Sequence, residues 1–246
     1  IFYSIFGFQR IGDLAWAAGD SRARGFLLGA TAGRTTLNGE GLQHEDGHSH
    51  LQSALIPNCV SYDPCFSYEL AVIMQNGLKR MVENQEDIYY YITVMNENYR
   101  HPDMPKGVEQ GIIDGIYQFS SSKVKGPKVQ LMGSGVILRE VIEAAAILEK
   151  DFSVAADVFS VTSFTEVRRN ALSIERWNRL NPDKKEKQSI LDNVITDKDS
   201  PVIASTDYMK SFPEQIGRFL KNTFIALGTD GYGRSDSRQA LRSFFE

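Results

Sequence analysis

The sequence contains little cysteine and no long apolar run. Cys59 and Cys65 are its two cysteines, whereas a disulfide-stapled protein would normally carry more. We therefore expect two free thiols and a reducing compartment, namely the cytoplasm. No segment approaches the ~20 consecutive apolar residues of a membrane span, and no basic start with an apolar core predicts a secretory signal. These absences argue against a disulfide scaffold and an integral membrane protein.

A strong charge of one sign is also missing. The formal net charge is −4, and the sequence lacks the basic stripe that nucleic-acid binding requires. The short basic run of Lys184, Lys185 and Lys187 is interrupted by Asp183 and Glu186. This run therefore predicts a solvated surface rather than a phosphate site, and we expect no nucleic acid among the partners.

The length and the apolar content favour two modest domains. Apolar residues make up 42% of the 246 residues, which is enough for two packed cores. Ile1, Phe2 and Tyr3 open the chain with apolar side chains and no Met, whereas natural termini are usually polar and frayed. We therefore expect the sequence to be a piece of a larger polypeptide.

Apolar spacing predicts a first α/β domain over residues 1–100. Its predicted elements are a helix over 8–24, strands over 25–31, 58–62 and 88–94, and a helix over 67–82. The run 88–94 is continuous and β-rich, which is typical of a central parallel strand. The segment that follows is polar and contains several prolines, so we expect a linker over 101–127.

Strands and helices alternate regularly over 128–246. The predicted strands are 129–133, 157–162, 201–205 and 224–228, and the predicted helices are 138–150, 164–178, 212–220 and 237–245. This rhythm predicts a second α/β domain, an open and mostly parallel sheet flanked by helices.

Two glycine-rich turns of this second region are similar to phosphate-binding loops. Gly133-Ser134-Gly135 follows a strand and precedes a helix, but Leu138 stands where the third glycine of a dinucleotide fingerprint should be. The segment 228–236 lacks the Gly-Lys-Ser/Thr ending of a P-loop. A tight turn and a loop that caps the last helix are therefore the better predictions.

The segment 35–50 concentrates residues that can do chemistry. It holds three of the four histidines of the chain, and its ionisable residues are Glu40, His44, Glu45, Asp46, His48 and His50. Histidine is readily tuned to titrate near neutral pH, and the glycines in the segment let the backbone approach a ligand closely. These features predict a function-bearing loop on a rigid scaffold.

The loop leaves three interpretations open. In an extended segment His44, Asp46, His48 and His50 would share one face, and zinc hydrolases use such nitrogen and oxygen ligands. Gly47 interrupts that run, however. Alternatively, a histidine can bind a substrate carboxylate or oxyanion beside an organic cofactor. The third interpretation is a polar surface loop.

The start of the chain is crowded with aromatic residues. Phe2, Tyr3, Phe6 and Phe8 lie within its first residues, and most such side chains pack in a core. A Tyr hydroxyl and a Phe ring near the histidine loop would also suit a flat heteroaromatic ring.

Several segments of the sequence together resemble a known family. Glu45-Asp46-Gly47 followed by Ser49-His50 is similar to the Glu-Asp-Gly-Pro-Thr-His element of transketolase-like thiamine diphosphate enzymes. The longer strings over 12–20 and 33–50 more closely resemble the first components of bacterial pyruvate dehydrogenases, the homodimeric decarboxylating type. This resemblance continues at 96–99, 160–166 and 228–236, and so covers essentially the whole chain.

The resemblance implies an architecture and an activity. Residues 1–100 would be the C-terminal half of a pyrimidine-binding domain, and 128–246 a transketolase-type C-terminal domain. The reaction would be oxidative decarboxylation of pyruvate with acetyl transfer to the lipoyl group of a dihydrolipoamide acetyltransferase, carried out by a homodimer. The cofactors would be thiamine diphosphate and Mg²⁺, whose diphosphate and metal ligands would lie outside this chain. The isolated chain would therefore be inactive.

The resemblance also implies roles for individual residues. His44 and Tyr3 match substrate-facing positions, and Phe6 matches an aromatic residue stacked on the pyrimidine ring. Glu40 would support the loop as part of the catalytic set. Further substrate-loop residues would be Asp46, His48 and His50, although His48 replaces the Pro of the transketolase element. No metal ligand is assigned within the chain. The alternatives are a zinc-dependent hydrolase built on the cluster from His44 to His50 and a non-catalytic dimerisation module.

Overall fold

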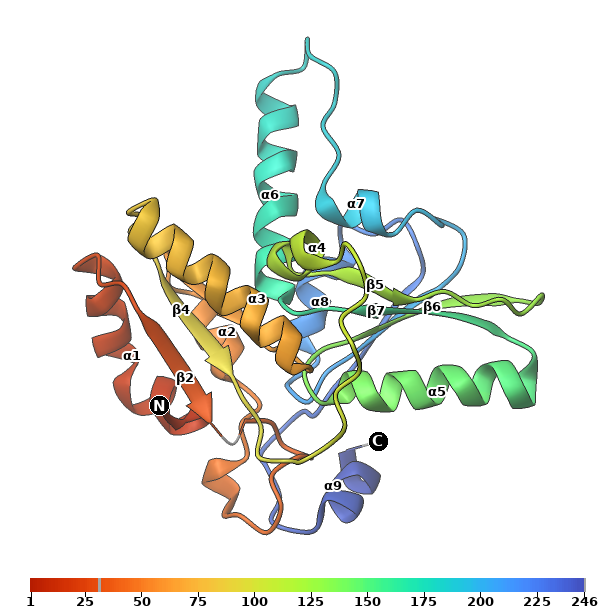
Figure 1. The fold of residues 1–246 in the computed structure, drawn as a ribbon, viewed down its shortest axis with the longest axis horizontal. Helices are drawn as coiled ribbons and strands as arrows, with labels where there is room; N and C mark the ends of the chain where they lie inside the picture. The colour runs from red at the N-terminus through yellow and green to blue at the C-terminus, as the bar shows by residue number, and fades with distance from the viewer. Residues whose placement is uncertain (31, 246) are drawn as a thin grey trace.

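The chain folds around two mostly parallel sheets (Figure 1). The computed structural model describes residues 1–30 and 32–245, and the side chains of these residues except 2–7. In the first sheet the strand order is β1-β2-β4-β3, and all pairs are parallel. Its strands are β1 (Phe2–Tyr3), β2 (Phe26–Ala30), β3 (Cys59–Tyr62) and β4 (Tyr89–Thr93).

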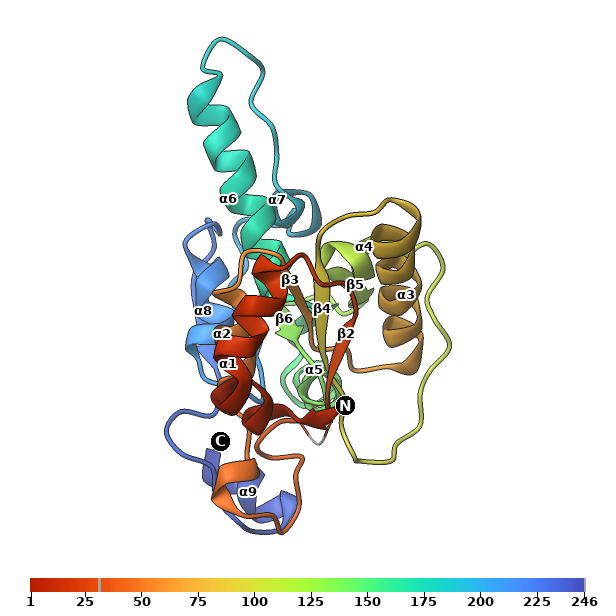
Figure 2. The ribbon, with the colours of Figure 1, turned by 90° about the vertical axis from the view of Figure 1, so that its left-hand side faces the viewer.

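Helices cover both faces of this first sheet, as Figure 2 shows. On one face lie α1 (Ser4–Asp20) and α2 (Ser49–Ala54), and on the other lies α3 (Ser67–Leu78), which continues into the π-helical turn η2 (Lys79–Glu83). Strand β4 is buried throughout. Its side chains alternate, so that Tyr91 packs with Phe8 of α1, while Tyr90 packs with Ile73 of α3. Because β4 is buried on both faces, its sequence is a continuous run of aromatic and β-branched residues without polar alternation.

The second sheet has the order β5-β7-β6-β8-β9, in which β5 is antiparallel to β7 and the other pairs are parallel. Its strands are β5 (Tyr117–Ser120), β6 (Lys128–Gly133), β7 (Ala155–Ser160), β8 (Val202–Ser205) and β9 (Phe224–Leu227). The helices that follow or precede them are α4 (Glu109–Asp114), α5 (Ile137–Phe152), α6 (Phe164–Leu180), α7 (Ile190–Val194), α8 (Ser211–Gly217) and α9 (Arg238–Phe245).

Two cores cover the faces of this second sheet. On one face Leu131 and Val158 pack with Val141 of α5. On the other face Met132 packs in a cluster with Phe164 of α6 and with residues of α8. The alternation of side chains along β6 therefore joins the sheet to both helical layers.

The predicted α/β fold with mostly parallel sheets flanked by helices is confirmed. The range 101–127, expected as a linker, contains α4 and the edge strand β5, and Tyr117 of β5 pairs with Ser160 of β7. Strand β5 was not predicted because it is an edge strand of four residues in which Gln118 and Ser120 are exposed. The exact domain boundary stays a prediction.

Two expectations from composition can be compared with the fold. Cys59 and Cys65 are both buried free thiols, as predicted. Over residues 1–30 and 32–245, no helix has the length and the apolar character that crossing a bilayer would require.

Candidate active site

The segment after β2, residues 33–50, is called the substrate loop below, after the role that the sequence analysis predicts for it. It leaves the carboxyl end of β2, includes the short helix η1 (Leu42–His44), and leads into α2. In Figures 1 and 2 this loop lies beside α9, which is the last helix in chain order. The carboxyl ends of parallel strands are where α/β folds usually bind ligands, so the loop has the expected position for a site.

The carboxylate of Asp207 anchors the first residues of the substrate loop to the second sheet. Asp207 lies just after β8 and accepts backbone N–H groups from Arg34 at 2.9 Å and Thr35 at 3.0 Å. The hydroxyls of Thr35 and Thr36 donate to it at 2.7 and 2.8 Å. Burial raises the pKa of Asp207, and these donors oppose that shift. Gly33 is required here, because its φ is +88° and a Cβ would lie 2.2 Å from the carboxylate.

Arg34 is a buried cation inside the loop. Its guanidinium donates to the carbonyl of Thr229 and lies 3.3 Å from Nδ1 of His48. It packs so closely on Gly47 that a Cβ there would lie 2.3 Å from Cζ. Burial lowers the pKa of Arg34, against the pull of the Asp46 and Asp207 carboxylates. Neither Arg34 nor Asp207 was singled out in the sequence, because their roles depend on contacts between distant segments.

His44 and Glu40 are brought together at the accessible part of the loop. Nδ1 of His44 lies 2.9 Å from Oε2 of Glu40, and the side chains are 20% and 38% exposed. A carboxylate at Nδ1 sets the tautomer and the orientation of an imidazole ring. Of the residues predicted to act in the loop, this pair has both a mutual contact and access from outside.

Asp46 and His50, in contrast to the Glu40–His44 pair, are buried and contact other parts of the protein. Asp46 is buried and accepts the backbone N–H groups of His48 and Ser49, both at 3.0 Å, so it caps the start of α2. His50 is 1% exposed, stacks on Phe212 with ring centroids 4.9 Å apart, and lies 2.9 Å from the Thr93 hydroxyl. Burial lowers the pKa of His50 to about 3, so the ring is neutral. The substrate-loop role that the resemblance implies for both residues stays a prediction.

The proposed zinc ligands do not converge. His44 contacts Glu40, His48 contacts Arg34 and His50 contacts Thr93, while Asp46 caps a helix. Within the described residues, no group of three His, Cys, Asp or Glu side chains could hold a metal ion. The sequence argument assumed an extended segment, whereas the chain here turns through η1 and enters α2. Alternate residues therefore do not share one face.

Glu45 is buried beside this site without a hydrogen-bond donor among the described residues. Burial raises the pKa of Glu45, the nearby Asp207 and Glu40 carboxylates add to this shift and Arg34 opposes it, so that the pKa is about 8. Glu45 is therefore mainly protonated at neutral pH. No role was predicted for this residue, since its burial comes from the second half of the chain.

Tyr3 and Phe6 have side chains that lie outside the described residues. The backbone nevertheless locates them: Tyr3 ends β1 and pairs with Ala30 of β2, and Phe6 follows in the first turn of α1. Both positions therefore lie at the carboxyl edge of the sheet from which the substrate loop departs.

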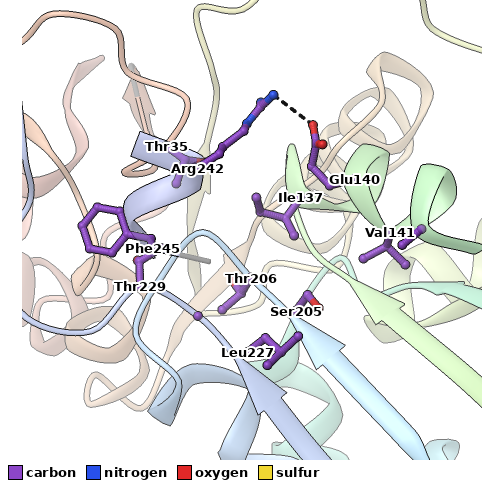
Figure 3. Close-up of a pocket in the computed structure, with 12 residues that line it drawn as sticks. Thr35, Ile137, Glu140, Val141, Ser205, Thr206, Leu227, Thr229, Arg242 and Phe245 are labelled. Atoms are coloured by element: carbon purple, nitrogen blue, oxygen red, sulfur yellow. Dashed lines mark ion pairs between the residues drawn. The ribbon is translucent and has the colours of Figure 1, made fainter. Parts of the chain in front are cut away.

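A separate cavity of about 300 Å³ lies at the carboxyl ends of β8 and β9 (Figure 3). Thr35 of the substrate loop, Thr206 and Thr229 line it, together with an ion pair between Arg242 and Glu140 at 3.0 Å. None of the predicted site residues is among those that line this cavity, so it is distinct from the Glu40–His44 pair.

The turn Gly133-Ser134-Gly135 is a tight structural turn, since Gly135 has a φ of +50° and a Cβ there would lie 2.4 Å from Asp63.

Two protein-family models match the chain. The model described as pyruvate dehydrogenase E1 component middle domain matches residues 1–102. The model described as transketolase-like TK C-terminal domain matches residues 115–246. The first match contains the substrate loop, and the second contains Asp207 and α9.

Curated relatives match along the whole chain. The pyruvate dehydrogenase E1 component of Pseudomonas aeruginosa is 63% identical over 248 residues, and that of Escherichia coli K12 is 59% identical over 248 residues. Each match covers 100% of this chain and 28% of the relative. The chain thus spans little more than a quarter of the length of these relatives.

Solved transketolase structures share the fold. The transketolase of Campylobacter jejuni has a TM-score of 0.74 at 16% identity, over 99% of this chain and 33% of that chain. The transketolase of Leishmania mexicana has a TM-score of 0.70 at 14% identity, over 99% of this chain and 31% of that chain.

Proposed function

The chain belongs to the transketolase-like family and matches the middle and C-terminal domains of pyruvate dehydrogenase E1 components, and from this premise we propose that it forms the substrate-facing part of a thiamine diphosphate-dependent enzyme. The activity that we propose for the full-length enzyme is the oxidative decarboxylation of pyruvate with acetyl transfer to a lipoyl group. On its own, the chain should be inactive.

The observation that carries this proposal is the Glu40–His44 pair. Its 2.9 Å contact and its partial exposure leave an oriented imidazole where a small substrate can reach it. Glu40 fixes the orientation of the ring, as a carboxylate does for a catalytic histidine. His44 can then orient a 2-oxo acid and offset negative charge that develops on its oxygen.

The positions of Tyr3 and Phe6 support a cofactor at the same edge of the sheet. Thiamine diphosphate, when bound, would supply the electron sink that loss of carbon dioxide from a 2-oxo acid requires. We assign stacking on its pyrimidine ring to Phe6 and a substrate-facing position to Tyr3. The backbone of both residues lies at the carboxyl edge of the first sheet, beside the start of the substrate loop, which fits a ligand bound there. We place the ligands of Mg²⁺ and of the diphosphate outside this chain.

We further propose that the full-length enzyme is a cytoplasmic homodimer that delivers its two-carbon unit to a lipoyl-bearing dihydrolipoamide acetyltransferase. The names of the relatives support pyruvate as the substrate.

The test is a substitution of His44 in the full-length enzyme. His44→Ala should lower kcat/KM for pyruvate by a factor of about 10²–10⁴, with little change in the affinity for thiamine diphosphate, measured by calorimetry. His101→Ala is the matched control, because this histidine lies away from the substrate loop and accepts the backbone N–H of Ser67 at 3.0 Å. An unchanged kcat/KM, or a loss of cofactor affinity that explains the defect, would contradict the assigned role.

Neither alternative function is supported. The predicted zinc ligands have separate partners, as described above, and the family matches point to a decarboxylating enzyme component rather than to a zinc hydrolase. The same matches favour an enzyme part over a purely non-catalytic dimerisation module.

A further inference from the structure

The segment that leads into α9 contacts the substrate loop directly ahead of Glu40. Nε of Arg238 donates to the carbonyl of Thr36 at 2.6 Å, and the backbone N–H of Arg238 donates to Oδ1 of Asn38 at 3.2 Å. The N–H of Gly39 donates to the carbonyl of Asp236 at 2.9 Å. Residues 236–238 of the second domain thus bind residues 36–39 of the first.

The second half of the loop rests on the second domain as well. Gly233 approaches so closely that a Cβ there would lie 2.1 Å from Cβ of Glu45 and 3.0 Å from the carbonyl of Leu42. The N–H of Met209 donates to the carbonyl of Gly47 at 3.0 Å. Together with the contacts of Asp207, these interactions mean that the second domain shapes the loop on both sides of His44.

Arg238 is itself oriented by the segment that follows β4. Its Nη2 donates to Oδ1 of Asn96 at 3.4 Å, and its Nε lies 3.9 Å from Oε2 of Glu97. Arg242, one turn further along α9, pairs with the same Glu97 at 3.3 Å and with Glu140 at 3.0 Å. Among the described residues, Arg242 makes no hydrogen bond to the substrate loop. The two arginines therefore share a role in docking α9 and differ in their contact with the loop.

We propose that Arg238 is a positioning residue of the active site, which acts from the second domain by fixing the Thr36 carbonyl and hence the Glu40–His44 pair. Thr36 is bound on two sides, since its hydroxyl donates to Asp207 and its carbonyl accepts from Arg238. Loss of one side frees the loop to shift, and a displacement of about 1 Å at a reacting group can cost ~10²-fold in rate. The inference rests on the role proposed for His44.

The experiment compares Arg238→Met and Arg242→Met in the full-length enzyme, each with His44 intact and in the His44→Ala background. Arg238→Met should lower kcat/KM for pyruvate by a factor of ~10–100 when His44 is present. In the His44→Ala background it should add less than about threefold, because residues that act as one unit are not additive. Arg242→Met should change kcat/KM little in either background. The melting temperature of each variant measures how far the loss of α9 docking, which both substitutions share, destabilises the enzyme.

The outcomes separate this inference from the proposed function. Equal effects of Arg238→Met with and without His44, no effect at all, or a loss that Arg242→Met reproduces would each overturn the role of Arg238. The His44→Ala measurement alone decides the proposed function. If Arg238→Met does not fold, Arg238→Lys replaces it: Lys keeps the charge facing Glu97 but lacks the planar fork that reaches Thr36 and Asn96 together. Non-additivity with His44→Ala is again the expected result, and additivity overturns the proposal.

Discussion

Glu45 is the residue of the substrate loop whose protonation state should respond most clearly to pH. Its pKa is raised to about 8 by burial and by the Asp207 and Glu40 carboxylates, against Arg34, from an ordinary value of 4.5. Between these values the folded chain holds a proton that the unfolded chain releases, so Glu45 lowers the folding stability as pH rises. Glu45→Gln has no proton to lose, and its stability relative to wild type should therefore increase by up to about 1.4 kcal/mol per pH unit between pH 5 and 8.

Thermal melting of the full-length enzyme at pH 5, 6.5 and 8 measures this difference. Glu143→Gln on the exposed side of α5 is the control for the loss of a carboxylate, and we expect no comparable trend there. A Glu45→Gln variant whose advantage is the same at all three pH values would show that Glu45 is ionised in the folded protein.

The sequence could predict some of the site at the residue level. The family resemblance pointed to His44 and Glu40, and the structure brings the two side chains into contact, while their roles stay predictions. The buried surroundings of His50 could not be predicted, because its aromatic neighbours come from β4, α8 and the segment after β8. The role of a histidine depends on such neighbours, which a local pattern does not contain.

Asp207, which follows β8 in the second domain, holds the first residues of the substrate loop against that strand. Its carboxylate accepts from Arg34, Thr35 and Thr36 in a buried site. In Asp207→Asn an NH₂ group would face one of these donors, so we expect a loss of about 2–4 kcal/mol in stability. Hydrogen exchange should show faster exchange at the amides of Arg34 and Thr35. Asp230→Asn is the control, because Asp230 accepts the exposed N–H of Lys210 and should leave both amides protected.

Elements with a clear apolar pattern were predicted well, including four-residue strands such as β8 and β9, whereas three short elements without such a pattern were missed. The continuous run 88–94 became β4 over Tyr89–Thr93, and the amphipathic run 138–150 became α5. Strand β5 and helices α4 and α7 have four to six residues each. Segments this short complete fewer than two helical turns or only two strand alternations, and so tertiary contacts decide their structure.

At the scale of the whole molecule, the substrate loop belongs to the first domain in sequence but is bound by the second. Asp207, Arg34 with Thr229, and the contacts of residues 233–238 all cross between the domains. No pattern within 33–50 could reveal this, because the partners lie in the last quarter of the chain. The loop should therefore keep its structure whenever both domains of this chain are present.

That expectation separates folding of the loop from catalysis in the isolated chain. The 246-residue chain contains the interactions that order the loop, so the amides of Thr35 and Gly39, which donate to Asp207 and to the Asp236 carbonyl, should be protected from exchange. It should nevertheless release no carbon dioxide from pyruvate with thiamine diphosphate and Mg²⁺ added, because catalysis by the cofactor needs binding groups that we place outside the chain. The full-length enzyme under the same conditions is the positive control. Sustained turnover by the isolated chain would show that it carries the cofactor site itself, whereas unprotected amides would show that the loop needs more of the protein to fold.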